Sequence, residues 1–187
     1  MAKKQLNPQT LLAPVPAALI SCGREGEEPN IITLAWVGVV CSDPPMVSIA
    51  VRPGRYSYDI IKETKEFVIN LPLESQAEVV DACGLVSGRK VEKFKHFNLT
   101  PQKGALKQAP AIAECPISLE CEVRQVLALG AHHLFLGEVI SVLAEENICD
   151  AKGKVDANKA PLLGYAATGQ YLGIKPLGPR IGFSAKK

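Results

Sequence analysis

Residues 30–61 read NIITLAWVGVVCSDPPMVSIAVRPGRYSYDII, and two apolar stretches in this segment flank CSDPP at residues 41–45. The stretches predict a buried strand over residues 31–40 and a second strand over residues 46–52. Each proline fixes its own φ and disfavours helix at the residue before it, so the connection should be rigid. Val47, Ile49 and Val51 share one face of the second strand, and that face should pack on a core.

Polar side chains recur in this segment at positions where a plain hydrophobic core would carry Val or Leu. They are Thr33, Ser42, Ser48, Arg52 and Ser57. A polar strand face usually meets solvent, and that interpretation stays open beside a ligand-binding one. Ser57 precedes Ile60, Ile61 and Thr64 at helical spacing, so we expect it to be the N-cap of a short helix.

The remaining chain adds more short strands than helices. Apolar alternation predicts strands over residues 17–22, 66–71, 117–124 and 133–144, a further strand after residue 161, and a second helix from Ser75. The second half lacks the helices that a parallel doubly wound sheet requires. We therefore expect one domain over residues 1–187, mainly β, built as a six-stranded antiparallel barrel with short flanking helices.

The composition excludes several classes of protein. Hydrophobic residues make up 47% of the 187 residues and charged residues 21%, which is typical of a packed globular chain. A formal net charge of +2 and an aromatic content of 5% argue against a nucleic-acid partner. Prolines interrupt the N-terminal segment and the apolar runs are too short to cross a bilayer, so we expect a cytoplasmic protein with no membrane contact.

Sequence motifs exclude the common catalytic and metal sites. The six cysteines form no C-x-x-C pair and have no histidine at finger spacing, so we expect no metal and no disulfide framework. Such cysteines are usually small buried hydrophobes, although Cys41 lies inside the unusual segment and its role stays open. No G-x-G-x-x-G, phosphate-binding P-loop or G-x-S-x-G motif is present.

The region from Arg52 to Ser57 suits a phosphate group. A guanidinium, a hydroxyl and the free N–H groups at a helix start would meet there, and the helix macrodipole also favours an anion. Arg-Pro-Gly turns and serine caps are also common without any ligand, so this pattern alone leaves both interpretations open.

Several segments in order resemble the flavin reductase-like family of FMN-binding split barrels, and within it the flavoredoxin branch. They are NIITLAW at residues 30–36, CSDPPMVS at 41–48, Arg52 with Ser57, EFVIN at 66–70, SGRKVEKF at 87–94, HLFLGEV at 133–139 and the segment from Pro161 to Tyr171. Lys90 stands where the family pattern has an acidic residue, and this departure concerns substrate choice. The segment GYA at residues 164–166 lacks the pair of tyrosines in the family pattern.

The resemblance implies a Greek-key split barrel with FMN along its first strands. The residues implied to contact the isoalloxazine are Thr33, Leu34, Ala35, Trp36, Cys41 and Ser42. Those implied to face the ribityl phosphate are Ser48, Arg52 and Ser57. In a homodimer, Arg89, Lys93 and Phe94 would reach the partner's cofactor, while His133 and Tyr171 would lie at the edge of the nicotinamide or the flavin.

Each of these roles has an ordinary structural alternative. A lone tryptophan in an apolar strand, here Trp36, is more often a core residue than a cofactor wall. The basic run near residue 90 is equally consistent with a solvated loop. Hydrogen bonding alone could account for His133, and packing could account for Tyr171.

The resemblance implies three alternative functions. The first is an oxidoreductase in which hydride passes from NADH or NADPH to N5 of FMN and electrons pass on to free flavin, a ferric chelate or another small acceptor. No acid–base residue is obligatory for this, because hydride transfer depends mainly on stacking and distance. The second is a flavoredoxin-type electron carrier with a redox protein partner, and the third is a split-barrel binding module without flavin.

Overall fold

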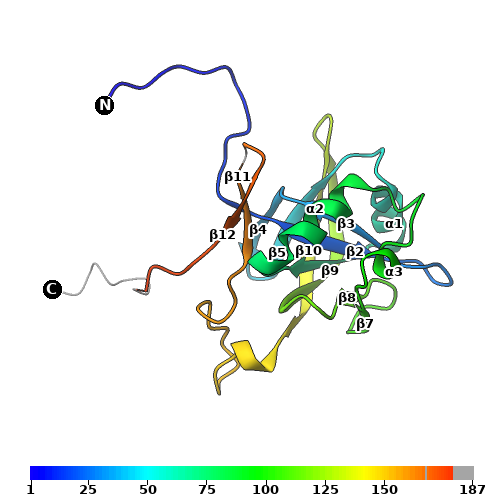
Figure 1. The fold of residues 1–187 in the computed structure, drawn as a ribbon. Coiled ribbons are helices and arrows are strands. Elements are labelled where there is room, and N and C mark those ends of the chain that lie inside the picture. Colours follow the sequence, from blue (N-terminus) through cyan, green and yellow to red (C-terminus); the bar gives the residue numbers. More distant parts are fainter. Residues whose placement is uncertain (167, 179–187) are drawn as a thin grey trace.

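The computed structural model describes residues 1–166 and 168–178, and its main feature is a seven-stranded antiparallel sheet (Figure 1). Its strands, in spatial order, are β3 (Asn30–Leu34), β2 (Ala18–Cys22), β6 (Glu66–Leu71), β9 (Ile117–Ala128), β10 (His133–Ala144), β5 (Pro45–Val51) and β4 (Val37–Ser42). The mainly β prediction is confirmed. The Greek-key order is confirmed too, because β6 pairs with β2 and β9 rather than with β5, the strand before it in the chain.

The two edge strands of this sheet, β3 and β4, are consecutive in the chain and are separated only by a bend at Ala35 and Trp36. At the bend, the backbone N–H of Ala50 in β5 donates to the carbonyl oxygen of Trp36 over 3.0 Å. Counted as one bent strand, β3 and β4 close the sheet into the predicted barrel of six strands.

The prediction of a single buried strand over residues 31–40 is wrong. β3 is covered, but β4 is largely exposed, with Val39 and Val40 exposed to 82% and 51%. The hydrophobic pattern of a strand shows that a face is apolar, but it does not show whether other residues of the same chain cover that face. For this reason β3 and β4 could not be told apart in the sequence.

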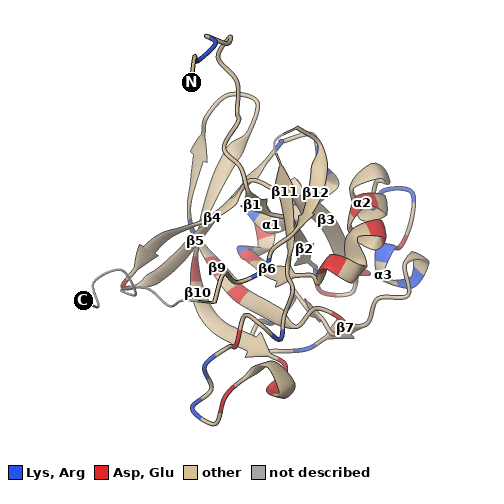
Figure 2. Ribbon diagram, turned by 60° about the vertical axis from the view of Figure 1, so that its left-hand side comes forward, with Lys and Arg blue, Asp and Glu red and all other residues tan. Residues whose placement is uncertain are grey.

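Smaller elements surround the barrel. The short strands are β1 (Val15–Pro16), β11 (Leu163–Ala166) and β12 (Gln170–Gly173) in one sheet, and β7 (Pro101–Gln102) and β8 (Ala111–Ile112) in another. The helices are α1 (Tyr56–Thr64), α2 (Ala77–Leu85) and α3 (Lys93–His96), with single turns η1 (Glu74–Gln76) and η2 (Glu146–Ile148). Helices α2 and α3 pack on β3 and lie on the same side of the barrel (Figure 2).

The chain builds two main hydrophobic clusters because β2 is buried on both faces. Ile20 belongs to the cluster that also contains Ile49, Phe67 and Phe135. The next residue along the strand, Leu19, belongs to the cluster that contains residues of α2 and α3. Successive side chains of a strand point to opposite faces, so β2 separates the barrel interior from the helical layer.

Asn70 anchors the segment between α3 and β9 to the sheet. Its Nδ2 donates to the carbonyl oxygen of Leu19 and to Ser21 Oγ, both at 2.9 Å, while its Oδ1 accepts from the backbone N–H of Ile112 at 2.9 Å and from Ser118 Oγ at 2.8 Å. A buried amide that satisfies both its donor and its acceptor in this way fixes the position of all four partners.

The start of α1 differs from the sequence prediction. The N-cap is Arg55, in extended conformation and without a side-chain cap, and the helix begins at Tyr56. Ser57 lies in the first turn, and its Oγ accepts a hydrogen bond of 2.7 Å from Asn30 Nδ2. The N-cap prediction for Ser57 is wrong because the hydroxyl points into the protein. The second helix, expected from Ser75, begins at Ala77, because Ser75 lies inside η1, which leads into α2.

Candidate functional site

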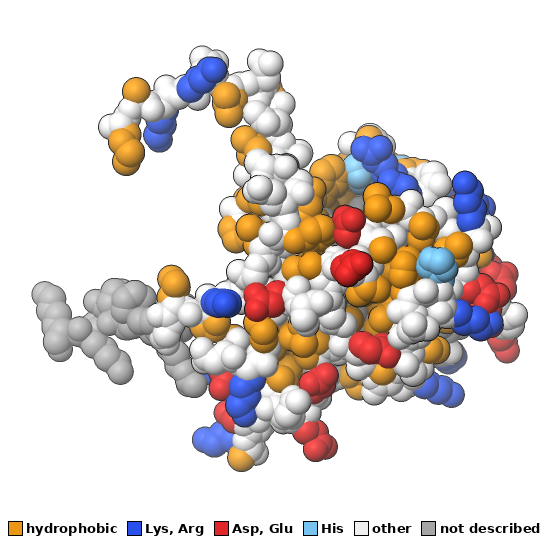
Figure 3. Space-filling view, viewed as in Figure 1, with side chains coloured by type: hydrophobic (Ala, Val, Ile, Leu, Met, Phe, Trp, Pro, Cys, Tyr) orange, Lys and Arg blue, Asp and Glu red, His pale blue; other side chains and the backbone are white. Residues whose placement is uncertain are grey.

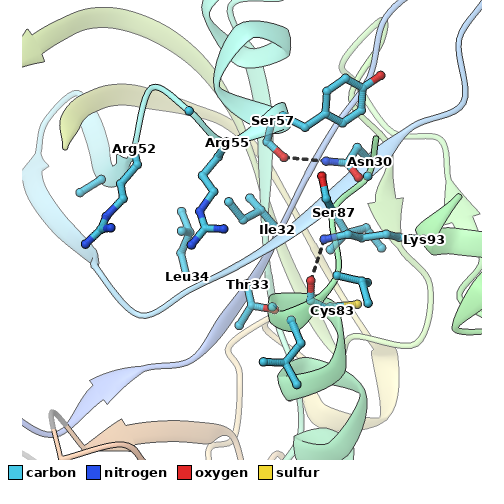
Figure 4. A pocket seen from close by; sticks show the side chains of 18 of the residues that line it. Asn30, Ile32, Thr33, Leu34, Arg52, Arg55, Ser57, Cys83, Ser87 and Lys93 are labelled. Atoms are coloured by element: carbon cyan, nitrogen blue, oxygen red, sulfur yellow. Dashed lines mark hydrogen bonds between the residues drawn. The ribbon is translucent and has the colours of Figure 1, made fainter. Parts of the chain in front are cut away.

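A cavity of about 220 Å³ opens between β3, the turn that connects β5 to α1, and the segment that follows α2 (Figure 4). Thr33 and Leu34 line it from β3, Arg52 and Ser57 from the turn and the first turn of α1, and Lys93 from α3. These five predicted residues therefore come together in one chain. Arg55 and His132, which the sequence analysis did not select, line the same cavity.

Lys93 is the most informative side chain of this cavity. It is 3% exposed, and its Nζ donates a hydrogen bond of 2.6 Å to the carbonyl oxygen of Cys83. Within the described residues, no carboxylate oxygen lies within 4.0 Å of Nζ. Burial lowers the pKa of Lys93. A buried ammonium group without an anionic partner is costly, and an anion in the cavity would compensate it.

The start of α1 adds hydrogen-bond donors to the same cavity. The first N–H groups of a helix have no intrahelical acceptor, and the macrodipole places partial positive charge there. Ser57 Oγ accepts from Asn30, and a hydroxyl group can donate as well as accept. Figure 4 shows Ser57, Ser87 and Lys93 close together beside this helix start, with Arg55 reaching into the cavity. The donor set suits a phosphate group.

Gly88 brings the loop after α2 close against this end of the cavity. A Cβ atom at this position would collide with the Asn30 side chain and with the ring of Tyr56. Only a residue without a side chain allows such an approach of the backbone. The sequence signal for it was the SGRK segment, which the resemblance had already singled out.

A second cavity of about 490 Å³ adjoins the first and shares Thr33, Leu34, Arg52, Arg55 and His132 with it. The second cavity is also lined by residues that the first one lacks, among them Ala35, Trp36, Asp81, Tyr165 and Tyr171. The phosphate-compatible end thus leads into a wider space that has aromatic side chains on its walls.

Trp36 and His132 form one wall of the second cavity. Their ring centroids are 4.2 Å apart at an interplanar angle of 56°. Arg52 Nε lies 3.3 Å from His132 Nε2, so Nε2 accepts and the ring proton is on Nδ1. Burial and the charges of Arg52 and Arg55 lower the pKa of His132, which keeps the imidazole neutral. Trp36 is 46% exposed, so its interpretation as a core residue is wrong.

His133 lies away from both cavities. Its Nδ1 is 2.7 Å from the hydroxyl oxygen of Tyr58, and the two rings meet edge to face at 5.3 Å. It is His132, the neighbouring residue, that lines the cavities. Adjacent strand residues face opposite sides, and the sequence alone did not show which of the two faces the ligand.

Tyr171, the other residue expected near the cofactor edge, does line the second cavity. Its hydroxyl donates to Asp81 Oδ1 over 3.1 Å, and its ring meets Tyr165 edge to face at 5.6 Å. Burial and the adjacent carboxylate raise the pKa of Tyr171 to about 12, so the phenol stays protonated and keeps donating to Asp81.

Other residues selected from the sequence lie elsewhere. Ser48 lines a third cavity of about 470 Å³ beside Trp36 and the N-terminal segment. Cys41 and Ser42 end β4 and line none of the cavities found among the described residues; the Cys41 thiol donates to the carbonyl oxygen of Asp43 over 3.3 Å. Within this chain, neither residue joins the other candidate cofactor contacts.

The basic segment after α2 serves more than one purpose. Arg89 is exposed, pairs with Asp59 at 3.7 Å and lies over the ring of Tyr56 at 5.1 Å. Phe94 is 4% exposed and belongs to the cluster beneath α2, so packing accounts for it. Lys93 faces the cavity of its own chain.

The described residues offer neither a metal centre nor a membrane-spanning helix. No group of three or more His, Cys, Asp or Glu side chains among them is placed to hold a metal ion. None of the helices in this part of the chain has the length and apolar character needed to cross a membrane.

Comparison with known proteins gives the family. A model of the flavin reductase like domain matches residues 11–170, which include every cavity residue described above except Tyr171. The chain belongs to the flavin reductase-like family. An uncharacterized protein of Archaeoglobus fulgidus is 33% identical to this family member over 158 residues, which cover 84% of this chain and 87% of that protein.

Solved structures agree with the predicted split barrel. The flavoredoxin of Desulfovibrio vulgaris (Miyazaki F) is 30% identical, with a TM-score of 0.91 over 100% of both chains. The FMN-binding protein from Thermus thermophilus with bound 1-cyclohex-2-enone is 25% identical, with a TM-score of 0.78 over 96% of this chain and 98% of that one. The resemblance to the flavoredoxin branch is confirmed.

Proposed function

We propose that this flavin reductase-like protein binds FMN in the two joined cavities. The observation that carries the proposal is Lys93, a buried ammonium that faces the first cavity without a carboxylate partner among the described residues. A phosphate there would accept from Lys93, from Ser57 and from the free N–H groups of α1. The name of the Thermus thermophilus relative, an FMN-binding protein, supports the same choice of cofactor.

The isoalloxazine would then extend into the second cavity. Small side chains at Thr33, Ala35 and Ala50 leave space for a flat ring beside the bend of the first strands. Trp36 and His132 would flank it, and neutral His132 would present Nδ1–H as a donor. Preorganised donors of this kind stabilise negative charge that develops on a ligand.

We infer that the activity is an NAD(P)H-dependent reduction of flavin or of a ferric chelate. When bound, FMN supplies a ring that accepts a hydride at N5 and passes two electrons to an acceptor. The role of the chain is to bind and orient FMN and the nicotinamide nucleotide. Lys93, Arg55 and α1 hold the phosphate of FMN, and the second cavity leaves room for a second ring against the flavin. No side chain is assigned an obligatory proton transfer.

We also propose that the chain works as a homodimer in the cytoplasm. Val39 and Val40 on β4, with Ile140 and Val142 on β10, are exposed apolar side chains that a second copy could cover. The N-terminal segment, which reaches away from the body (Figure 3), carries exposed Leu11 and Leu12. All six cysteines are free, which suits a reducing compartment.

The second candidate is an electron carrier. The likeness to a flavoredoxin over the full length of both chains favours it. In this function the same FMN site would exchange electrons with a redox protein, and NADH or NADPH would reduce the flavin poorly.

Anaerobic visible spectra of the purified protein separate these functions. We expect added FMN to be retained after gel filtration with a shifted absorption band, and NADH or NADPH to bleach that band within seconds. A retained band that bleaches only with dithionite or a reduced ferredoxin-like protein would favour the electron carrier. Loss of all FMN on gel filtration would contradict FMN as a resident cofactor.

A further inference from the structure

Asp81 is a charged residue of the site, like Lys93, but the proposed binding of FMN gives it no role. It lies on α2 and, among the described residues that line the second cavity, it is the one acidic side chain. The same cavity is lined by Arg52 and Arg55, which come from the turn before α1. The second cavity therefore offers positive charge from one element and negative charge from another.

Tyr171 holds the Asp81 carboxylate in place. Its hydroxyl donates to Oδ1 over 3.1 Å, and this is the one hydrogen bond that the Asp81 side chain makes within the described part of the chain. An ionised carboxylate has about four acceptor positions, so most of its capacity stays available. Asp81 can therefore accept a hydrogen bond from a ligand and repels an anionic group.

The side chains that line the second cavity indicate which class of ligand it can bind. Trp36, His132, Tyr165 and Tyr171 supply aromatic surface against which a planar ring can pack. Arg52 suits a phosphate, and Asp81 suits an N–H group. A planar ring that carries both an amide and a phosphorylated sugar meets all three requirements, and a nicotinamide nucleotide is such a molecule.

We propose that Asp81, positioned by Tyr171, is a specificity residue that accepts a hydrogen bond from the carboxamide N–H of the hydride donor. This inference rests on the proposed reductase function and adds how its nicotinamide substrate is recognised. Asp81 contacts the substrate, and Tyr171 acts through Asp81. The pairing selects ligands that carry an N–H donor on the ring over isosteres that lack it.

The test compares the reduced dinucleotide with its 3-acetylpyridine analogue, in which a methyl ketone replaces the carboxamide and removes the N–H donor. Rapid mixing without oxygen gives the concentration of each donor that half-saturates flavin reduction. For the wild type, we expect the analogue to need about tenfold more, because it lacks the N–H group that donates a hydrogen bond to the charged acceptor. In Asp81→Asn, the side-chain amide can donate to the carbonyl group of either ligand, so the ratio should approach one.

Two variants serve as controls. Glu78→Gln removes an exposed acidic group of the same helix that lines neither of the two joined cavities, and it should keep the wild-type ratio. Tyr171→Phe leaves the carboxylate present but no longer held, and should give an intermediate ratio. The dissociation constant for FMN should be the same in Asp81→Asn and the wild type.

The outcomes are distinguishable. If neither NADH nor NADPH reduces the wild type, the proposed reductase function fails, and this inference fails with it. If the wild type is reduced but does not discriminate against the analogue, Asp81 does not recognise the carboxamide, while the reductase function stands. If Asp81→Asn weakens FMN binding instead, Asp81 contacts the flavin and the inference is overturned.

Discussion

Lys93 Nζ donates to the backbone carbonyl oxygen of Cys83, which lies in the last turn of α2. The last carbonyl groups of a helix have no intrahelical donor, and cations are favoured at this end of the macrodipole. The lysine therefore satisfies the end of α2 while its ammonium faces the cavity beside the start of α1. One side chain connects the two helices to the proposed phosphate position.

Lys93→Met tests this assignment. The variant keeps a long side chain but loses the charge, so its dissociation constant for FMN should rise by about ten- to a hundredfold, in the range expected for a charge-assisted hydrogen bond. Riboflavin has no phosphate, and its affinity should stay within about twofold. Fluorescence titration of both flavins provides the measurement. Lys90→Met, at an exposed position in the preceding loop, is the control and should bind both flavins as the wild type does. If Lys93→Met weakens riboflavin binding as much as FMN binding, Lys93 does not contact the phosphate.

Arg55→Ala and Arg52→Ala separate the two arginines. Arg52 already donates to His132, whereas Arg55 has no hydrogen bond or ion pair assigned among the described side chains. We therefore expect Arg55→Ala to weaken FMN binding by about 2 kcal/mol and Arg52→Ala to weaken it by less. Calorimetric titration with FMN would measure both. A larger loss for Arg52→Ala would make Arg52, rather than Arg55, the main phosphate partner.

Much of the fold could be predicted from residue patterns. The alternation in β5 predicted which side chains are buried, and the apolar pattern of β10 predicted its bounds exactly as observed. These predictions succeed because the local period of a strand and the burial of one face are both visible in a short window. The bend at Ala35 and Trp36 was not visible, because it depends on where β4 pairs with β5.

The candidate site was predictable in outline only. Thr33, Arg52, Ser57 and Lys93 were selected and do line the first cavity. Asp81 was missed because an exposed acidic residue on a helix usually has no role beyond solvation, and its hydrogen bond with the distant Tyr171 leaves no trace in the sequence. Contacts between segments so far apart in the sequence leave no local pattern.

The cysteines should differ sharply in reactivity. Burial raises the pKa of Cys83 to about 11 and that of Cys22, Cys115 and Cys121 to about 12. Cys41 and Cys149 are only partly covered. The thiolate is the reactive form, so a thiol reagent at pH 8 should label these two positions quickly and the other four only after unfolding. Mass spectrometry of the labelled protein counts the sites.

A double variant completes this test. Cys41→Ser with Cys149→Ser should leave no rapidly labelled site in the folded protein. Rapid labelling of Cys22 or Cys83 would mean that the reagent reaches the buried side of the first cavity, which Cys83 lines, and would contradict the enclosed position of Lys93 beside them.

The hydrogen bond between Tyr171 and Asp81 should make stability depend on alkaline pH. The pKa of Tyr171 is raised from an ordinary value of 10.0 to about 12 in the folded chain. The unfolded chain therefore loses this proton first as the pH rises. The contribution of protonated Tyr171 to the free energy of unfolding is present in full below pH 10 and declines as the pH rises from 10 to about 12.

Tyr171→Phe isolates this contribution, because other groups that titrate in the same range do so in both proteins. Urea unfolding at pH 9 and at pH 11 should give a difference in unfolding free energy between wild type and variant that narrows at the higher pH. The direction follows from proton binding alone, since the variant has no phenol to ionise at this position. A difference that stays constant or widens would show that Tyr171 ionises at its ordinary pKa, and that it does not hold Asp81 at the second cavity.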